Sequence, residues 1–262
     1  MAFFPIANTS KATGYTTLHN FPTNNWESIV NIKKSVWAIY SDGVKWITIE
    51  LDNIEIGDSK TYYYNDIIKK QNKKVNPLVL LQFRKTSLSG TLKTLPKHEF
   101  VYNSTPEWRA TIGFSLNQAQ TSYQGEINPF PPMATLLTFH PFIQYNETEN
   151  HFLFFNLESD PKFRQAYIEI YEANSKKFIN KIQVLSNSCT RIPLDKYRFK
   201  KEDLPVFICR SMGGIPFGFG VSKKADMLSL EHTHPPASFA VHGERFAVQR
   251  EIKRRWLTIL KP

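Results

Sequence analysis

Cysteine is nearly absent from this sequence, which has only Cys189 and Cys209 among 262 residues. One pair is far below the density at which disulfides replace a hydrophobic core in small secreted domains. Cys209 lies in the apolar run VFICR, which predicts a buried thiol. A disulfide framework is therefore excluded, and the fold must be stabilised by its core.

Long apolar runs are also missing. No run reaches the eighteen or more residues that a membrane-spanning helix needs. The first residues, MAFFPIANTSKATG, lack the basic segment and long apolar stretch of a secretory signal. We therefore expect no membrane span and a cytoplasmic protein.

The motifs of several common enzyme classes are absent. The sequence has no G-x-x-x-x-G-K-[ST] phosphate loop and no G-x-G-x-x-G dinucleotide signature. It also lacks H-E-x-x-H, paired C-x-x-C and G-x-S-x-G. These absences argue against common nucleotide-binding enzymes, zincins, zinc ribbons and α/β-hydrolases, but not against every enzyme.

Helical periodicity is scarce before residue 243. The segment GERFAVQREIKRRWLTIL (243–260) has apolar residues at roughly helical spacing and predicts a C-terminal helix. A shorter helix is expected around NDIIKKQ (65–71). Elsewhere the sixteen prolines and eleven glycines of the chain interrupt it often, which favours many short strands.

Strand patterns are abundant, and aromatic residues make up 14% of the chain. EWRATIGFSL (107–116) alternates apolar and polar residues, as a half-buried strand does. Asp42-Gly43 separates two β-rich runs within 35–51, which predicts a tight hairpin. Polar turns separate strand-like runs within 134–158 and within 166–185, and both stretches are predicted to be hairpins.

Strand-like runs that are separated by turns at short intervals predict an all-β fold. We expect an antiparallel β-sandwich or barrel-like core with a short C-terminal helix. The proline-rich segment NPFPPMA (128–134) suggests a division into two halves. Residues 1–128 would form an N-terminal β-rich half. Residues 129–262 would form a C-terminal β-rich half with the terminal helix. The halves are either two subdomains or one continuous domain.

A histidine cluster lies in LSLEHTHPPASFAVHGE (228–244). His232 and His234 are two positions apart, so on a strand both imidazoles share one face. If the chain turned back antiparallel after them, His242 would lie opposite His232. Three converging imidazoles could bind a divalent metal such as zinc, iron or copper.

The same cluster supports two further interpretations. Without a metal, a histidine could act as general acid or base, with Glu231 or Glu244 beside it. Glu244 would lie on the histidine side, as a fourth ligand or as the base. In the other interpretation the histidines only form hydrogen bonds at a strand end. A shift of register by one residue would send His242 to the opposite face.

A second candidate site combines Tyr123, Gln124 and Glu126 beside the proline-rich segment. An aromatic face stacks on apolar ligand faces, while amides and carboxylates bind hydroxyls, so these residues suit a pocket for a glycan or small molecule. His140, in TFHPF, either packs in the core or contributes to such a pocket.

The net charge of +10, from 33 Lys and Arg against 23 Asp and Glu, favours anionic partners in general. Three functions remain open. The first is a binding protein for a glycan or other hydroxyl-rich small molecule. The second is an enzyme that uses the histidine cluster. The third, a basic assembly or nucleic-acid-associated protein, is not favoured because the charges are spread along the chain.

Overall fold

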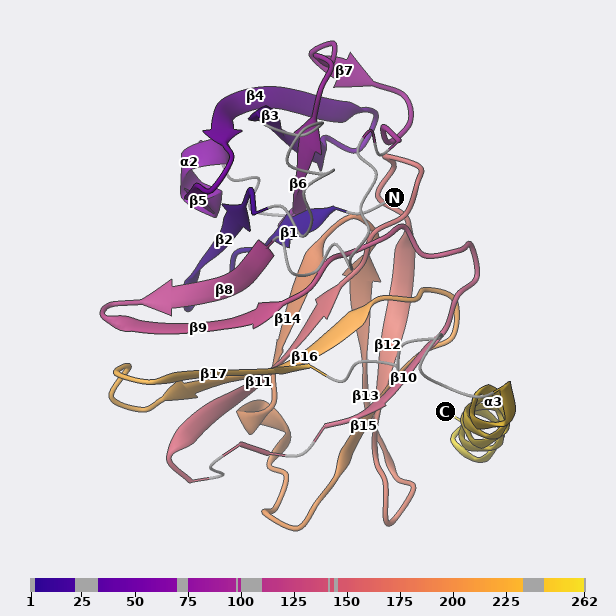
Figure 1. Ribbon diagram of the computed structural model, residues 1–262. Coiled ribbons are helices and arrows are strands. Elements are labelled where there is room, and N and C mark those ends of the chain that lie inside the picture. The colour runs from indigo at the N-terminus through magenta and orange to yellow at the C-terminus, as the bar shows by residue number, and fades with distance from the viewer. Residues whose placement is uncertain are drawn as a thin grey trace.

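The computed structural model describes residues 3–21, 33–69, 75–97, 99, 110–140, 142–143, 146–232 and 243–261, with the backbone alone for 33 and 243–250. Strands make up 52% and helices 8%. All pairings between the strands are antiparallel, and the described chain ends in helix α3 (Gly243–Ile259) (Figure 1). The predicted all-β class and the C-terminal helix are therefore confirmed.

Two sheets pack face to face in the N-terminal half. The first has the order β1 (Phe4–Ile6), β6 (Val79–Arg84), β3 (Lys33–Ser41), β4 (Trp46–Glu55) and β7 (Thr91–Leu92). The second has the order β5 (Ser59–Tyr63), β2 (Thr13–His19), β8 (Ala110–Leu116) and β9 (Ala119–Gln124). Side chains such as Phe4, Phe83 and Ile112 fill the core between them. The short helix expected around 65–71 is present as a single turn, α2 (Tyr64–Ile67), and residues 70 and 71 lie outside the described residues.

The C-terminal half is a second sandwich. One sheet has the order β10 (Leu136–Phe139), β15 (Pro205–Cys209), β12 (Gln165–Glu172) and β13 (Phe178–Leu185). The other has the order β14 (Cys189–Pro193), β11 (Thr148–Phe155), β16 (Ile215–Ser222) and β17 (Leu228–His232). Phe152 of β11 stacks on Phe207 of β15 with ring centroids 3.9 Å apart, and this contact joins the two sheets.

The hairpin predictions had mixed outcomes. The β3–β4 hairpin is confirmed: Gly43 has φ +95°, and Asp42 Oδ1 accepts hydrogen bonds from the N–H groups of Val44 and Lys45. The β12–β13 hairpin is also confirmed. The prediction of a hairpin within 134–158 is wrong. β10 pairs with β15, whereas β11 pairs with β14 and β16. The polar turn there connects two different sheets, which a period-two pattern does not distinguish from a hairpin.

The β14-β11-β16-β17 sheet is covered on both faces. Its second face packs against the N-terminal half, where Leu153, Phe155 and Phe217 share one hydrophobic cluster with Trp46 and Phe114. This double coverage explains the continuous apolar run in β11. β9 and β17 lie side by side across the same boundary (Figure 1). The shared core supports one continuous domain, and the boundary near residue 128 stays a prediction.

Helix α3 lies on the outer face of the β10-β15-β12-β13 sheet. Trp256 meets Phe139 edge to face at 5.1 Å, and Leu260 is fully buried beside Val206. Arg210 donates hydrogen bonds to the carbonyl oxygens of Leu257 (2.9 Å), in the last turn of α3, and of Leu260, which directly follows the helix. No helix in the described ranges is long and apolar enough to cross a membrane.

Candidate functional site

The structure describes the start of the predicted histidine cluster. Glu231 and His232 are the last residues of β17, whereas His234 and His242 lie outside the described residues. Glu244 lies at the start of α3, where only the backbone is described. The His232 ring packs against two aromatic rings, with centroids 4.9 Å from Tyr123 and 5.2 Å from Phe217. Convergence of the three histidines therefore stays a prediction.

His140 lies immediately after β10 and lines the same small cavity as Glu231 and His232, with a volume of about 80 Å³. Its ring lies over Gly218, where a Cβ would come within 2.8 Å of His140 Cε1. Burial lowers the His140 pKa to about 4, so the imidazole is neutral at pH 7. His140 Nε2 has no hydrogen-bond partner among the described residues. The structure thus joins His140 to the first two residues of the histidine cluster.

A metal centre needs more ligands than this cavity shows. Within the described part of the chain, no group of three or more His, Cys, Asp or Glu side chains could hold a metal ion. The cavity contributes two histidines and the exposed Glu231. A divalent metal at His232, His234 and His242 stays a prediction, because two of these residues lie outside the described ranges.

Tyr123, Gln124 and Glu126 do not form one pocket wall. The Tyr123 ring packs between the halves, 4.9 Å from Phe217, and burial raises the pKa of its hydroxyl. Gln124 is exposed at the end of β9. Glu126 accepts a hydrogen bond from Asn128 Nδ2 at 3.0 Å. Tyr123 therefore belongs to the aromatic contacts of His232, whereas the other two lie along the following loop.

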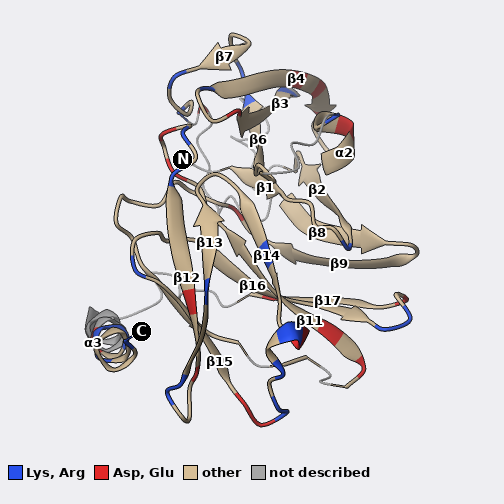
Figure 2. Ribbon diagram, turned by 180° about the vertical axis from the view of Figure 1, so that it is seen from behind, with Lys and Arg blue, Asp and Glu red and all other residues tan. Residues whose placement is uncertain are grey.

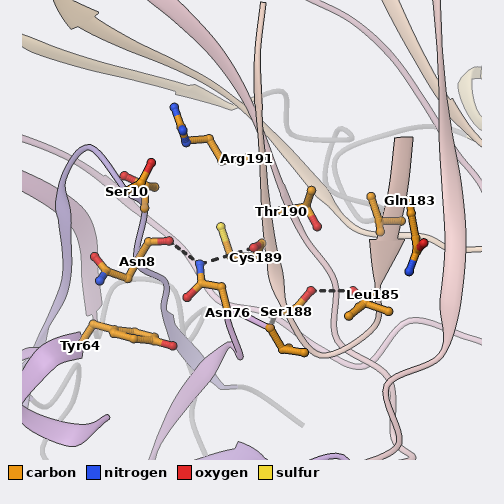
Figure 3. Close-up of a pocket in the computed structure, with 13 residues that line it drawn as sticks. Asn8, Ser10, Tyr64, Asn76, Gln183, Leu185, Ser188, Cys189, Thr190 and Arg191 are labelled. Carbon is orange, nitrogen blue, oxygen red and sulfur yellow. Dashed lines mark hydrogen bonds between the residues drawn. The ribbon is translucent and has the colours of Figure 1, made fainter. Parts of the chain in front are cut away.

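A larger cavity, of about 460 Å³, lies between the edge strand β14 and the N-terminal half (Figure 3). The loop after β1 and the helix α2 form one wall, and the ends of β13 and β14 form the other. Most of its polar side chains are amides and hydroxyls: Asn8, Asn76 and Gln183, and Thr9, Ser10, Ser188 and Thr190. We call this space the junction cavity.

Hydrogen bonds fix part of this lining. Asn76 Nδ2 donates to the carbonyl oxygens of Asn8 (2.5 Å) and Cys189 (3.4 Å), and so ties the two walls together (Figure 3). Ser188 Oγ donates to the Leu185 carbonyl at 2.7 Å. Asn8 Oδ1 is buried and has no hydrogen-bond partner within the described structure. A ligand donor would satisfy that acceptor.

The junction cavity has little chemical reactivity. Burial raises the pKa of the Cys189 thiol to about 12, so the thiol is protonated and a poor nucleophile at pH 7. Burial also raises the pKa of Tyr64, whose hydroxyl donates to the Pro77 carbonyl at 3.0 Å. The described lining contains no Asp, Glu or His, the side chains that most often act as general acid or base.

Arg191 is the one charged side chain in the described lining of the junction cavity. Arg191 Nη1 lies 3.2 Å from His151 Nδ1 on β11, within hydrogen-bond distance. Glu149 Oε2 lies 3.7 Å from His151 Nε2 and pairs with Lys11 Nζ at 2.7 Å. Burial lowers the pKa of His151 to about 4, so the guanidinium donates to a neutral ring.

Comparison with known proteins gives no match: no family model, no curated protein and no solved structure resembles this chain. The candidate site therefore depends on geometry alone. Sequence reasoning missed the junction cavity, because its residues come from positions 8–10, 64, 75–76 and 183–191. The one local signal was Arg191, a charged residue within the strand CTRIP.

Proposed function

We propose that this protein binds a hydroxyl-rich ligand, such as a glycan, in the junction cavity. The observation that supports the proposal is the lining, in which amides and hydroxyls predominate and the described residues include no carboxylate. The volume of about 460 Å³ lies within the range of roughly 300–1,000 Å³ typical of small-molecule sites.

Saccharides suit such a lining for a simple chemical reason. Each sugar hydroxyl both donates and accepts a hydrogen bond, and an Asn or Gln amide offers both functions on one side chain. Asn8, Asn76 and Gln183 therefore supply complementary groups from both walls. The proposal moves the pocket expected around Tyr123, Gln124 and Glu126 to the junction cavity. The cytoplasmic location expected from the sequence stays a prediction.

An array of immobilised saccharides, followed by calorimetry on each hit, tests the proposal. Ser10 is exposed and lines the junction cavity, so Ser10→Trp should obstruct it with little effect on the core. Ser87 is exposed in a loop outside the cavity lining, and Ser87→Trp is the matched control. We expect binding to the wild type and to Ser87→Trp, and loss of binding in Ser10→Trp. Equal binding by both variants would place the ligand elsewhere.

A second candidate function is acid–base or metal-dependent catalysis at the small cavity of His140. It is favoured by one observation, that Glu231 and His232 line the same cavity as His140. Metal analysis after dialysis against zinc tests its metal form. A stoichiometric metal that is lost in His232→Ala would support this candidate, whereas no metal in the wild type would contradict the metal form.

A further inference from the structure

We infer that the ligand of the junction cavity is an acidic saccharide whose carboxylate or sulfate group binds Arg191. This inference rests on the proposed function and names the class of ligand at the same site. It depends on the charge of the lining, the way in which Arg191 is held, and the open edge of β14.

The charge of the lining favours an anion. Arg191 is half-buried, and the described residues that line the cavity with it include no Asp or Glu. Arg191 forms no ion pair with any carboxylate in the described structure. Loss of solvent around the guanidinium lowers the pKa of Arg191, although it remains charged at pH 7. A ligand carboxylate or sulfate would replace the lost hydration with charge-assisted hydrogen bonds.

The position of the guanidinium is fixed before any ligand binds. His151 and Arg191 occupy diagonal positions on the paired strands β11 and β14, since His151 pairs with Pro193 and Leu153 with Arg191. His151 accepts at Nδ1 from Arg191, so the proton of the neutral ring is on Nε2, which faces Glu149. The bond uses one guanidinium N–H and leaves the others for a ligand.

Burial lowers the pKa of Arg191, and the negative charge of Glu149 partly opposes that shift, although Glu149 forms its ion pair with Lys11. Glu149 pairs with Lys11, which follows Ser10 of the cavity lining, and this ion pair is neutral as a unit. His151 is neutral as well. The charge that remains beside the cavity is that of Arg191, at the end of the view in Figure 3 opposite Tyr64.

The edge of β14 adds a backbone donor. The Cys189 N–H donates to the Asn76 carbonyl at 3.0 Å, on the side away from β11. Along an antiparallel strand, the backbone N–H groups point alternately toward the paired strand and away from it. The Arg191 N–H, two residues after Cys189, therefore also points away from β11. Among the described strands none pairs with β14 on that side, where residues 76–78 bridge only the residues at its start. The Arg191 backbone and side chain can therefore both donate to one acidic sugar.

Matched ligands test the inference on the wild-type protein. Trigalacturonic acid and its methyl ester carry the same ring hydroxyls and differ in charge, and sulfated maltotriose with maltotriose tests sulfate in the absence of any carboxylate. We expect calorimetry to show an acid or a sulfated form bound roughly tenfold or more tightly than its uncharged partner, the range for a charged hydrogen bond. Which pair binds distinguishes carboxylate from sulfate.

Two variants test whether Arg191 is the residue that binds the acidic group of the ligand. Arg191→Met should remove the preference for the acidic form, while Lys177→Met, at an exposed turn outside the cavity lining, removes the same charge and should leave the preference intact. If the uncharged form or neutral saccharides bind as tightly to the wild type, the inference is wrong but the proposed function stands. If no saccharide binds, both are wrong. The wild-type comparison remains decisive even if Arg191→Met does not fold.

Discussion

Arg191 and His151 are joined across two strands by a hydrogen bond of 3.2 Å between Nη1 and Nδ1. The bond requires a neutral imidazole, and burial keeps it neutral by lowering the His151 pKa to about 4. The one charged group of the described cavity lining is thus positioned by a residue that is itself uncharged. Stability and binding both depend on that state.

The free energy of unfolding should fall as the pH decreases from about 6.5 to about 4. The pKa values of His140 and His151 are both about 4 in the folded protein, against 6.5 for a solvated histidine. In this window the unfolded chain binds more protons than the folded one, so acid favours unfolding, and the contribution levels off below pH 4.

Urea denaturation across this range, with and without His140→Phe, isolates one histidine. In the variant, the free energy of unfolding should depend less steeply on pH, by the equivalent of up to one bound proton, because phenylalanine does not titrate. Identical slopes for the two proteins would show that His140 does not contribute.

Gly218→Ala should destabilise the C-terminal sandwich by about 1–3 kcal/mol, the usual cost of overpacking. The new Cβ would lie 2.8 Å from His140 Cε1, and Phe152 and Phe207, each 5.8 Å from the ring, restrict its movement. Gly90→Ala is the control, since nothing lies within 4 Å of its Cβ position. Thermal unfolding gives the comparison, and equal melting temperatures would contradict the packing described.

Arg210→Ala should loosen the attachment of α3 and cost about 1–2 kcal/mol. Arg210 binds two terminal carbonyls of the helix and Glu169 (3.0 Å), and its side chain is 36% exposed, which reduces the value of the ion pair. Arg254→Ala changes an exposed residue of the same helix and should have little effect. Hydrogen exchange in 251–260 measures the loosening directly; equal protection in both variants would rule it out.

Binding to polyanions should be weak, indifferent to sequence and strongly salt-dependent. Residues of both signs are distributed over the strands and loops (Figure 2), with a short basic run, Lys253–Arg255, on α3. Such a surface binds nucleic acid through counterion release alone. Tight binding to DNA or RNA that persists at high salt, and that Arg254→Glu abolishes, would instead favour the nucleic-acid-associated alternative.

Local patterns predicted the strands and not their partners. The alternation in 107–116 identified the buried face of β8, where Ala110, Ile112 and Phe114 are buried. Asp42-Gly43 predicted the β3–β4 turn because its chemistry is local. The sheet to which β11 belongs depends on its pairing with β14 and β16, which come much later in the chain, and no pattern within 134–158 contains that information.

The same limit applies to the sites. His140, Glu231 and His232 were each predicted, but their shared cavity depends on the close approach at Gly218. The junction cavity brings Asn8, Asn76 and Arg191 together from three distant segments, and none of them was a candidate before the fold was known.

The most direct test of saccharide binding in the junction cavity is a nitrogen-15 NMR titration with a saccharide identified on the array. The side-chain NH₂ signals of Asn8, Asn76 and Gln183 report on both walls of the cavity. We predict that these signals and the backbone N–H of Arg191 shift most and saturate together. Shifts that cluster instead around Glu231 and His232, with the three amides unchanged, would contradict the proposal.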